Sequence, residues 1–422
     1  MKARRWLPCP VPDITTLQET IRRCSQQVGR WLGVVFVAVA VLGCATRVVP
    51  IGGEGRRFVP DGDERGLWSA GEQEAAAIFK RVRGYDDPAL VNYLSGLAGK
   101  LVPDAARAAG GPELQVSVVR DPTLNAFAWP DGRLVVHTGL LASVESEAQL
   151  ALILGREVAH VVRRHALGAA RAGDTEPVTY EGAGPLSATG AAILGTRARL
   201  ATLAAITGYG ERAEAEADAD ALAAVARAGW DASHATAVYE ALGGNAVERG
   251  EIEIFQLGTP ARLQARSEAL RALSVPPTAL TAGGVTSEAF EAQRLRLSRE
   301  NAIEDARLGR IALARRQLDR ALAAAPADPT VHVYLGDLHR LQAQRAGSAP
   351  EREAEVEAAL RAYARALALD PARADVHRQL GLLYFQEQDA ARARTELREY
   401  LRLAPDAADA ARVAEYVREL GR

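Results

Sequence analysis

Apolar residues recur every three or four positions along most of this chain, a spacing that predicts amphipathic helices. Such stretches occupy most of 67–273 and return after residue 298. A short run rich in β-branched residues, LQVSVV at 114–119, predicts a strand. Within 121–141, Pro-Asp-Gly separates two short apolar runs, which predicts a hairpin. The pattern therefore predicts a mostly α fold with a small β-sheet.

The last part of the chain repeats itself with a period of about 34 residues, the length of a tetratricopeptide unit. Small residues at matching offsets let paired helices approach closely, and a proline ends each second helix. We expect a linker at 274–298, about three repeats over 299–405 with an insertion near 343–353, and a capping helix at 406–422. A plain helical bundle is the alternative. The clearest matching positions are Leu380, Gly381, Tyr384, Ala393 and Pro405.

One strongly apolar run, WLGVVFVAVAVLG, lies at 31–43 behind several basic residues. The uncharged stretch between Arg30 and Arg47 is sixteen residues long, whereas roughly 20 are needed to span a bilayer. The pattern is typical of a signal peptide at 1–43. Its end, VLGC, resembles a bacterial lipobox, which implies that Cys44 is lipidated and holds the protein to a membrane. An uncleaved membrane anchor is the alternative.

Composition narrows the picture further. The formal net charge is −2, so we expect no nucleic-acid partner. Cys44 is the only cysteine from residue 44 onwards, and the mature chain therefore cannot form an internal disulfide. Residues 44–66 are rich in Gly, Arg and Pro, which indicates a tether. Residues 168–197 are rich in Gly and Ala, which predicts a mobile loop or lid.

The stretch LGREVAHVVRRH at 154–165 differs by one letter from the zinc motif HExxH. In that motif, residues i and i+4 fall on one helix face, so that two imidazoles reach one ion. A glutamate between them acts as the general base on a metal-bound water. Glu157 and His160 stand at the spacing of the base and of one ligand. Arg156 occupies the position of the other histidine.

Together with NAFAWPDGRLVVHTGLL at 125–141 and GYGERAEAEADADALAAVARAGWD at 208–231, this stretch resembles metallopeptidase family forty-eight. These gluzincins include HtpX-like and CAAX prenyl endopeptidases, and an envelope branch carries C-terminal tetratricopeptide repeats. The resemblance implies an α+β gluzincin-type metallopeptidase domain at 67–273 that binds zinc. It also implies that Glu214 of an ExxxD element is the third zinc ligand. Asp218 would then orient a ligand histidine from behind.

Arg156 departs from the family's pattern at the metal itself. A guanidinium group has no acceptor and stays protonated. It opposes a neighbouring cation by about 4 kcal/mol per unit-charge pair at ~4 Å and an effective dielectric of 20. We expect Arg156 to take the place of zinc and to bridge Glu214 and Glu157, so that zinc is absent or weakly bound here. Two further departures from the family's pattern stand at 210–211 and at Thr259.

Three other histidines of this domain are candidates for the missing ligand. The helix is expected to continue to about Leu167, and His165, five residues after His160, would then point about 140° away. His137, on the strand before TGLL, is the remote candidate for contact with a metal, and a half-buried strand residue is the alternative. His234 follows a turn and is expected to serve surface or packing roles.

We favour a lipid-anchored protein of the cell envelope, on the periplasmic face and at the outer membrane, with a degenerate zinc-metallopeptidase domain. Its cleft would hold extended polypeptide clients without cleaving them, with the hairpin strand as a pairing edge. Its repeats would bind other envelope proteins in quality control or assembly. One alternative is an active zinc metalloendopeptidase with an altered ligand set and Glu157 as base. The other is an interaction scaffold in which only the repeats function.

Overall fold

The computed structural model describes residues 48–172, 177–179, 197–199, 209–249, 260–273 and 286–421. The chain divides into two units, Met1–Val49 and Pro50–Arg422, and every element below belongs to the second. The expected signal peptide, Cys44, Thr259 and most of the loop expected at 168–197 lie outside the described residues. Among the helices described, none is long and apolar enough to cross a membrane.

A three-stranded sheet in the order β1-β3-β2 forms the centre of the N-terminal domain. Strand β3 runs parallel to β1 and antiparallel to β2, so the predicted hairpin is confirmed. Strand β2 forms one edge of the sheet, and all three of its residues are buried. The strands are β1 (Gln115–Val119), β2 (Ala126–Ala128) and β3 (Arg133–His137).

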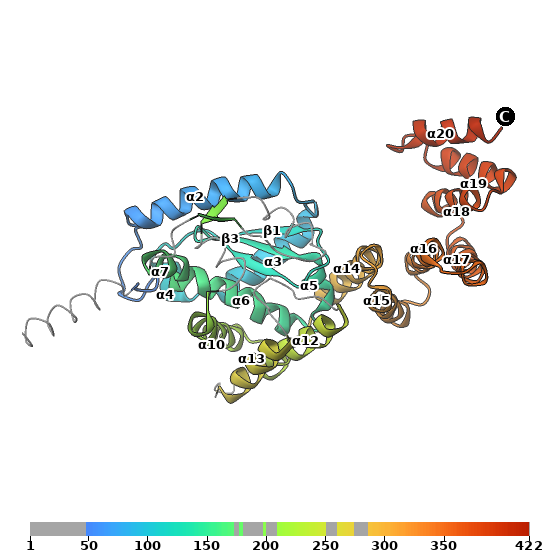
Figure 1. Ribbon diagram of the computed structural model, residues 1–422. Coiled ribbons are helices and arrows are strands. Elements are labelled where there is room, and N and C mark those ends of the chain that lie inside the picture. Colours follow the sequence, from blue (N-terminus) through green and yellow to red (C-terminus); the bar gives the residue numbers. More distant parts are fainter. Residues whose placement is uncertain are drawn as a thin grey trace, which may run out of the picture. The chain divides into compact units, whose positions relative to one another are not determined.

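Helices pack on this sheet and share one hydrophobic core with it (Figure 1). Helix α3 contacts β1, α6 contacts β2, and α10 lies along α6. Two short strands, β4 (Pro177–Thr179) and β5 (Arg197–Arg199), pair antiparallel as a separate ribbon. The helices of this domain are α2 (Gly62–Phe79), α3 (Pro88–Leu101), α4 (Asp104–Ala108), α5 (Thr138–Ser143), α6 (Glu147–Arg163), α7 (His165–Arg171), α10 (Glu211–Arg227), α11 (Ala232–Thr236), α12 (Val238–Arg249) and α13 (Pro260–Ala272).

Small residues bring α6 and α10 close together. A Cβ atom on Gly155 would lie 3.3 Å from the Cα atom of Ala221, so a larger residue at this position would push the two helices apart. Ala217 and Ala221 are fully buried at the same contact. The side chains that follow Gly155 on α6 therefore face the first turns of α10 at short range.

Helix α6 ends earlier than the sequence indicates. Its backbone stops at Arg164, which adopts a left-handed conformation with φ 58°. A new helix, α7, starts at His165. The expectation of one helix to about Leu167 is therefore wrong, because a left-handed residue interrupts the i→i−4 hydrogen bonds. The change of direction alters where His165 lies.

The C-terminal part consists of helix pairs, as the repeat predicts (Figure 1). A Cβ atom on Gly336 would lie 2.4 Å from the ring of Tyr363, which explains the small residue at this repeat position. The insertion near 343–353 lengthens both helices of its pair to 17 and 21 residues, against 13 and 14 in the next pair. The helices are α14 (Glu288–Arg307), α15 (Ile311–Ala324), α16 (Pro329–Arg345), α17 (Ala349–Leu369), α18 (Ala374–Gln386), α19 (Ala390–Leu403) and α20 (Ala410–Glu419).

The first helix of this part begins inside the expected linker. Residues 288–298 are helical, so the linker expected at 274–298 is shorter than the composition indicates. Phe290 and Leu297 of α14 belong to the core of the N-terminal domain. The hydroxyl of Ser298 donates to the carbonyl oxygen of Ala142 at 3.4 Å. The helical repeats are thus packed onto the domain through α14.

Candidate functional site

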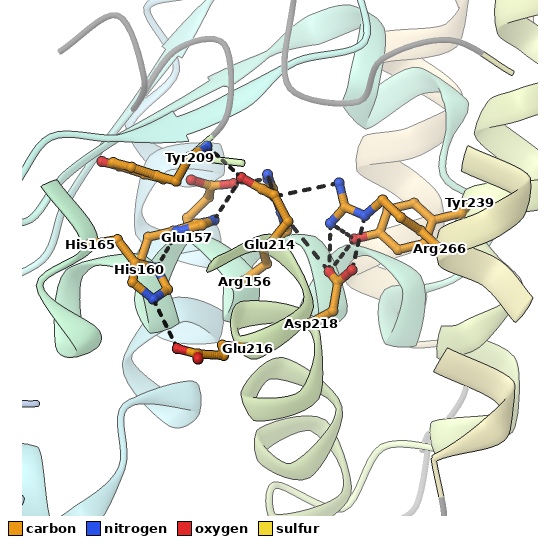
Figure 2. Close-up of polar contacts among 10 residues, drawn as sticks. All are labelled: Arg156, Glu157, His160, His165, Tyr209, Glu214, Glu216, Asp218, Tyr239 and Arg266. Carbon is orange, nitrogen blue, oxygen red and sulfur yellow. Dashed lines mark hydrogen bonds and ion pairs between the residues drawn. The ribbon is translucent and has the colours of Figure 1, made fainter. Parts of the chain in front are cut away.

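Helices α6 and α10 carry most of the side chains that the sequence singles out, and the structure brings five of them together. Arg156, Glu157 and His160 project from α6, while Glu214 and Asp218 project from α10 (Figure 2). Their spacing along each helix places them on the facing sides. The RExxH motif of α6 and the ExxxD motif of α10 therefore lie together, as the sequence predicts.

Arg156 lies at the centre of this cluster and is fully buried. Its Nε donates to Glu214 Oε2 at 2.9 Å, and its Nη2 donates to the same oxygen. Its Nη1 donates to Glu157 Oε1 at 2.6 Å. The predicted bridge between the two glutamates is therefore present (Figure 2). Such charge-assisted contacts are stronger than bonds between neutral groups.

Burial and charge set the protonation of the cluster. Burial by itself would raise the pKa of Glu214, but the Arg156 cation holds that pKa well below its usual range. For Glu157, burial outweighs the attraction of Arg156 and raises the pKa to about 8. Burial lowers the pKa of His160 to about 4, against the opposing pull of Glu214. Burial therefore favours the neutral form of both Glu157 and His160.

A second arginine, which the sequence analysis missed, completes the charge balance. Arg266 of α13 donates through Nε to Asp218 Oδ2 at 2.9 Å and through Nη2 to Asp218 Oδ1 at 2.6 Å. The hydroxyl of Tyr239 donates to Asp218 Oδ1 at 2.5 Å, and the guanidinium carbon of Arg266 lies 4.3 Å from the Tyr239 ring centroid. Two guanidinium ions therefore face the carboxylates of Glu214 and Asp218.

Asp218 has a different set of partners from the one that the resemblance implies. Its hydrogen bonds go to Arg266 and Tyr239, and its Oδ1 lies 4.0 Å from Arg156 Nε. Asp218 therefore orients cations at this site. No sequence signal distinguishes Arg266 from the other arginines of α13, because its role depends on where that helix packs.

His165 also departs from the expectation. The left-handed turn at Arg164 brings it back toward α6, and the two Nδ1 atoms of His160 and His165 lie 2.7 Å apart. The predicted direction, away from the site, is therefore wrong. The ring of Tyr209 packs against both histidines, with centroids 4.7 Å from that of His160 and 5.8 Å from that of His165. Its backbone N–H donates to Glu214 Oε1 at 2.9 Å.

The other two candidate histidines, His137 and His234, lie outside the Arg156 cluster. His137 is fully buried on β3, where its Nδ1 lies 2.7 Å from Thr123 Oγ1 and 3.7 Å from Asp121 Oδ1. These contacts tie it to the segment before β2. His234 is exposed on α11 and lies 3.0 Å from Asp231, as expected for a surface residue.

A zinc ion does not fit the cluster while Arg156 holds this position. The guanidinium group occupies the space between Glu157 and Glu214, and a dication there would meet a permanent positive charge. Within the described part of the chain, no group of three or more His, Cys, Asp or Glu side chains is arranged to hold a metal ion. The site is built around an internal cation.

The small sheet and the α6–α10 pair, with RExxH on one helix and ExxxD on the other, define a zincin-type domain joined to helical repeats. Residues 98–282 match Peptidase family M48. Residues 355–388 match the TPR repeat. The chain therefore carries a family-forty-eight peptidase domain followed by tetratricopeptide repeats.

Curated relatives match over short segments. The mitochondrial metalloendopeptidase OMA1 of Arabidopsis thaliana is 47% identical over 55 residues, 13% of this chain and 11% of that protein. The beta-barrel assembly-enhancing protease of Escherichia coli is 32% identical over 127 residues, 29% of this chain and 24% of that protein. This chain therefore matches less than a quarter of the length of either relative. A thermophilic TPR protein of Thermus thermophilus matches 44% of this chain and 80% of that chain, at 17% identity and a TM-score of 0.28.

Proposed function

We propose that this protein is a lipid-anchored component of the cell envelope that binds polypeptides and does not cleave them. Its family-forty-eight domain would hold extended clients, and its repeats would bind other envelope proteins. The observation that carries the proposal is the buried bridge from Arg156 to Glu214 and Glu157. This bridge gives each of the two glutamates a hydrogen-bonded cation as a partner.

The state of Glu157 supports the absence of cleavage. A general base must be ionised near the working pH and must reach the proton that it removes. Burial raises the pKa of Glu157 to about 8, and its Oε1 accepts a hydrogen bond from Arg156. A carboxyl group with a raised pKa, one oxygen of which is already bound by a guanidinium ion, is poorly suited to take a proton from water. The surroundings of Glu157 therefore support binding without cleavage.

The cellular setting rests on the N-terminal sequence and on the relatives. VLGC at 41–44 supports lipidation of Cys44, and lipid attachment would place the domain at a membrane surface. The Escherichia coli relative is a beta-barrel assembly-enhancing protease by name. We infer a position on the periplasmic face of the outer membrane, with envelope polypeptides under assembly or quality control as clients.

One observation favours a second candidate, an active zinc metalloendopeptidase with an altered ligand set. His160 Nε2 lies 3.6 Å from Glu214 Oε1, so two of the ligands that the family uses are adjacent. Glu157 Oε2 has no hydrogen-bond partner among the described residues. Displacement of Arg156 would be required before a metal could enter.

Zinc content and proteolysis of the purified full chain separate the two candidates. We expect far less than one zinc per chain by elemental analysis and no digestion of β-casein after overnight incubation with added zinc. Glu157→Gln is the matched control, because it removes the base and keeps the shape of the side chain. One tightly held zinc per chain, with casein digestion that Glu157→Gln abolishes, would establish the enzyme instead.

A further inference from the structure

A pocket on the N-terminal domain lies apart from the Arg156 cluster. It has a volume of about 310 Å³ and opens between α3, α4, the segment before β1, and one side of α6. This volume lies within the range of about 300 to 1,000 Å³ that is usual for ligand sites. Aliphatic side chains dominate its wall, with Val158, Val161 and Val162 from α6, Ile51 from the N-terminal segment, and Leu114.

A glycine leaves this pocket hollow. Gly99 of α3 lines the pocket, and a Cβ atom built on it would meet no atom within 4 Å. The space beside Gly99 is therefore empty, and a larger side chain at residue 99 could enter it. Gly96, three residues earlier on α3, is exposed and also has no atom near its Cβ position. The two glycines form a matched pair, one beside the pocket and one in solvent.

The mouth of the pocket carries both signs of charge. Arg107 and Glu113 line it, and both side chains are exposed. Arg107 Nη2 donates to the carbonyl oxygens of Gly99 and Val102 at 2.8 Å and 3.4 Å. Neither Arg107 nor Glu113 forms an ion pair with another described residue. A donor and an acceptor therefore remain available at the entrance.

An open strand edge begins beside this mouth. Leu114 lines the pocket and directly precedes β1, which is the outer strand of the sheet opposite β2. Gln115 N–H donates to Gly132 on the β3 side, so the backbone groups of Val116 point away from β3. In the described chain, Tyr85 N–H donates to the Val118 carbonyl oxygen at 2.9 Å, next to the bridge between Val119 and Gly84, so the open part of this edge is at Val116. Strand β2, by contrast, is buried throughout.

We propose that this pocket and the adjoining edge of β1 bind an extended polypeptide segment, with one aliphatic side chain in the pocket. The main chain would pair with β1, which is a common way to recognise extended peptides. The mixed charges at the mouth complement the N–H and C=O groups of a polypeptide. The carboxylate of Glu113 would repel the headgroup of an anionic lipid. This inference rests on the proposed function and names the surface that holds the client.

The test measures binding of an unfolded polypeptide to the full-length chain. Fluorescein-labelled, reduced and carboxymethylated lactalbumin is titrated with the protein, and fluorescence anisotropy is recorded. Gly99→Leu fills the pocket and is expected to weaken binding about tenfold. Gly96→Leu, with the same gain in helix propensity, is expected to bind as the unaltered protein does. Equal circular dichroism spectra establish that both variants are folded.

A photo-leucine-labelled form of the same polypeptide locates the contact. We expect crosslinks in the segments 95–114 and 158–162. Equal binding by Gly99→Leu and the unaltered protein, with crosslinks elsewhere, would overturn the pocket assignment and leave polypeptide binding intact. No binding to the unaltered protein would overturn the pocket and the proposed function together. Binding of phosphatidylglycerol vesicles that Gly99→Leu abolishes, with polypeptide binding unchanged, would assign the pocket to lipid.

Discussion

Replacement of Arg156 by methionine tests whether its guanidinium group stabilises the domain. Methionine keeps most of the volume but removes the closer of the two cations beside Glu214, since Arg266 Nη1 lies 3.6 Å from Glu214 Oε2. The exposed fractions of the two side chains are 1% for Arg156 and 13% for Glu214, so solvent screens this charge only slightly. Removal of one partner of such a buried pair costs about 3–5 kcal/mol. For a domain of this size, that corresponds to a drop in Tm of about 6–20 °C.

The assay is urea unfolding followed by tryptophan fluorescence. All five tryptophans lie before residue 231, so the signal reports on the N-terminal half of the chain and not on the repeats. Arg163→Met on the same helix is the matched control. Its partner Asp220 is held at 2.5 Å and 2.8 Å, but the two side chains are 30% and 39% exposed. An exposed pair of this kind contributes no more than about 1 kcal/mol.

A double variant separates charge from packing. Adding Glu214→Gln to Arg156→Met removes the carboxylate that has lost its closest cation, and we expect it to recover part of the lost stability. Equal, small losses for Arg156→Met and Arg163→Met would refute the reasoning, because the buried bridge would then contribute no more than a surface pair. Failure of Glu214→Gln to recover any stability would assign the loss to packing.

Two other predictions follow from the same cluster. Arg156→His removes the internal cation and supplies an imidazole one turn before His160, so we expect this variant to retain about one zinc per chain after dialysis; an unchanged metal content would show that more of the site than Arg156 prevents binding. The second concerns pH, because burial raises the pKa of Glu157 from 4.5 to about 8. The folded state therefore binds the proton more tightly, and this group's contribution to stability is full below pH 4.5 and is lost as the pH rises to about 8. Urea midpoints measured from pH 5 to pH 8 should fall less for Glu157→Gln than for the unaltered protein, and parallel curves would contradict the raised pKa.

Local patterns were sufficient for the elements whose partners are near in sequence. Pro-Asp-Gly between two apolar runs predicts the β2–β3 hairpin, because a turn and its flanking strands are adjacent in the chain. The period of the small residues predicts the repeats, since each helix pair packs mainly on its neighbours. Periodicity fails at the end of α6, where Arg164 is left-handed, and at α14, which looks like a linker by composition.

The chemistry of the site divides in the same way. The spacing of Arg156, Glu157 and His160 is a property of one helix, and a permanent cation among buried carboxylates demands the bridge that is found. Charge and helical geometry, together with the resemblance to metallopeptidase family forty-eight that singled out Glu214, were enough to predict that contact from the sequence. They also place a permanent positive charge at the position of the expected metal ligand, and this charge opposes binding of a metal ion there.

Only the tertiary structure decided what surrounds the bridge. Arg266 and Tyr239 reach Asp218 because α12 and α13 pack beside α10, and no local pattern encodes that packing. His165 meets His160 because one residue changes the direction of the chain. The sheet edge that we propose for a client is that of β1, because the elements packed around β2 bury all three of its residues. Helix periodicity is a short-range property, whereas contacts between distant segments depend on how the whole core packs.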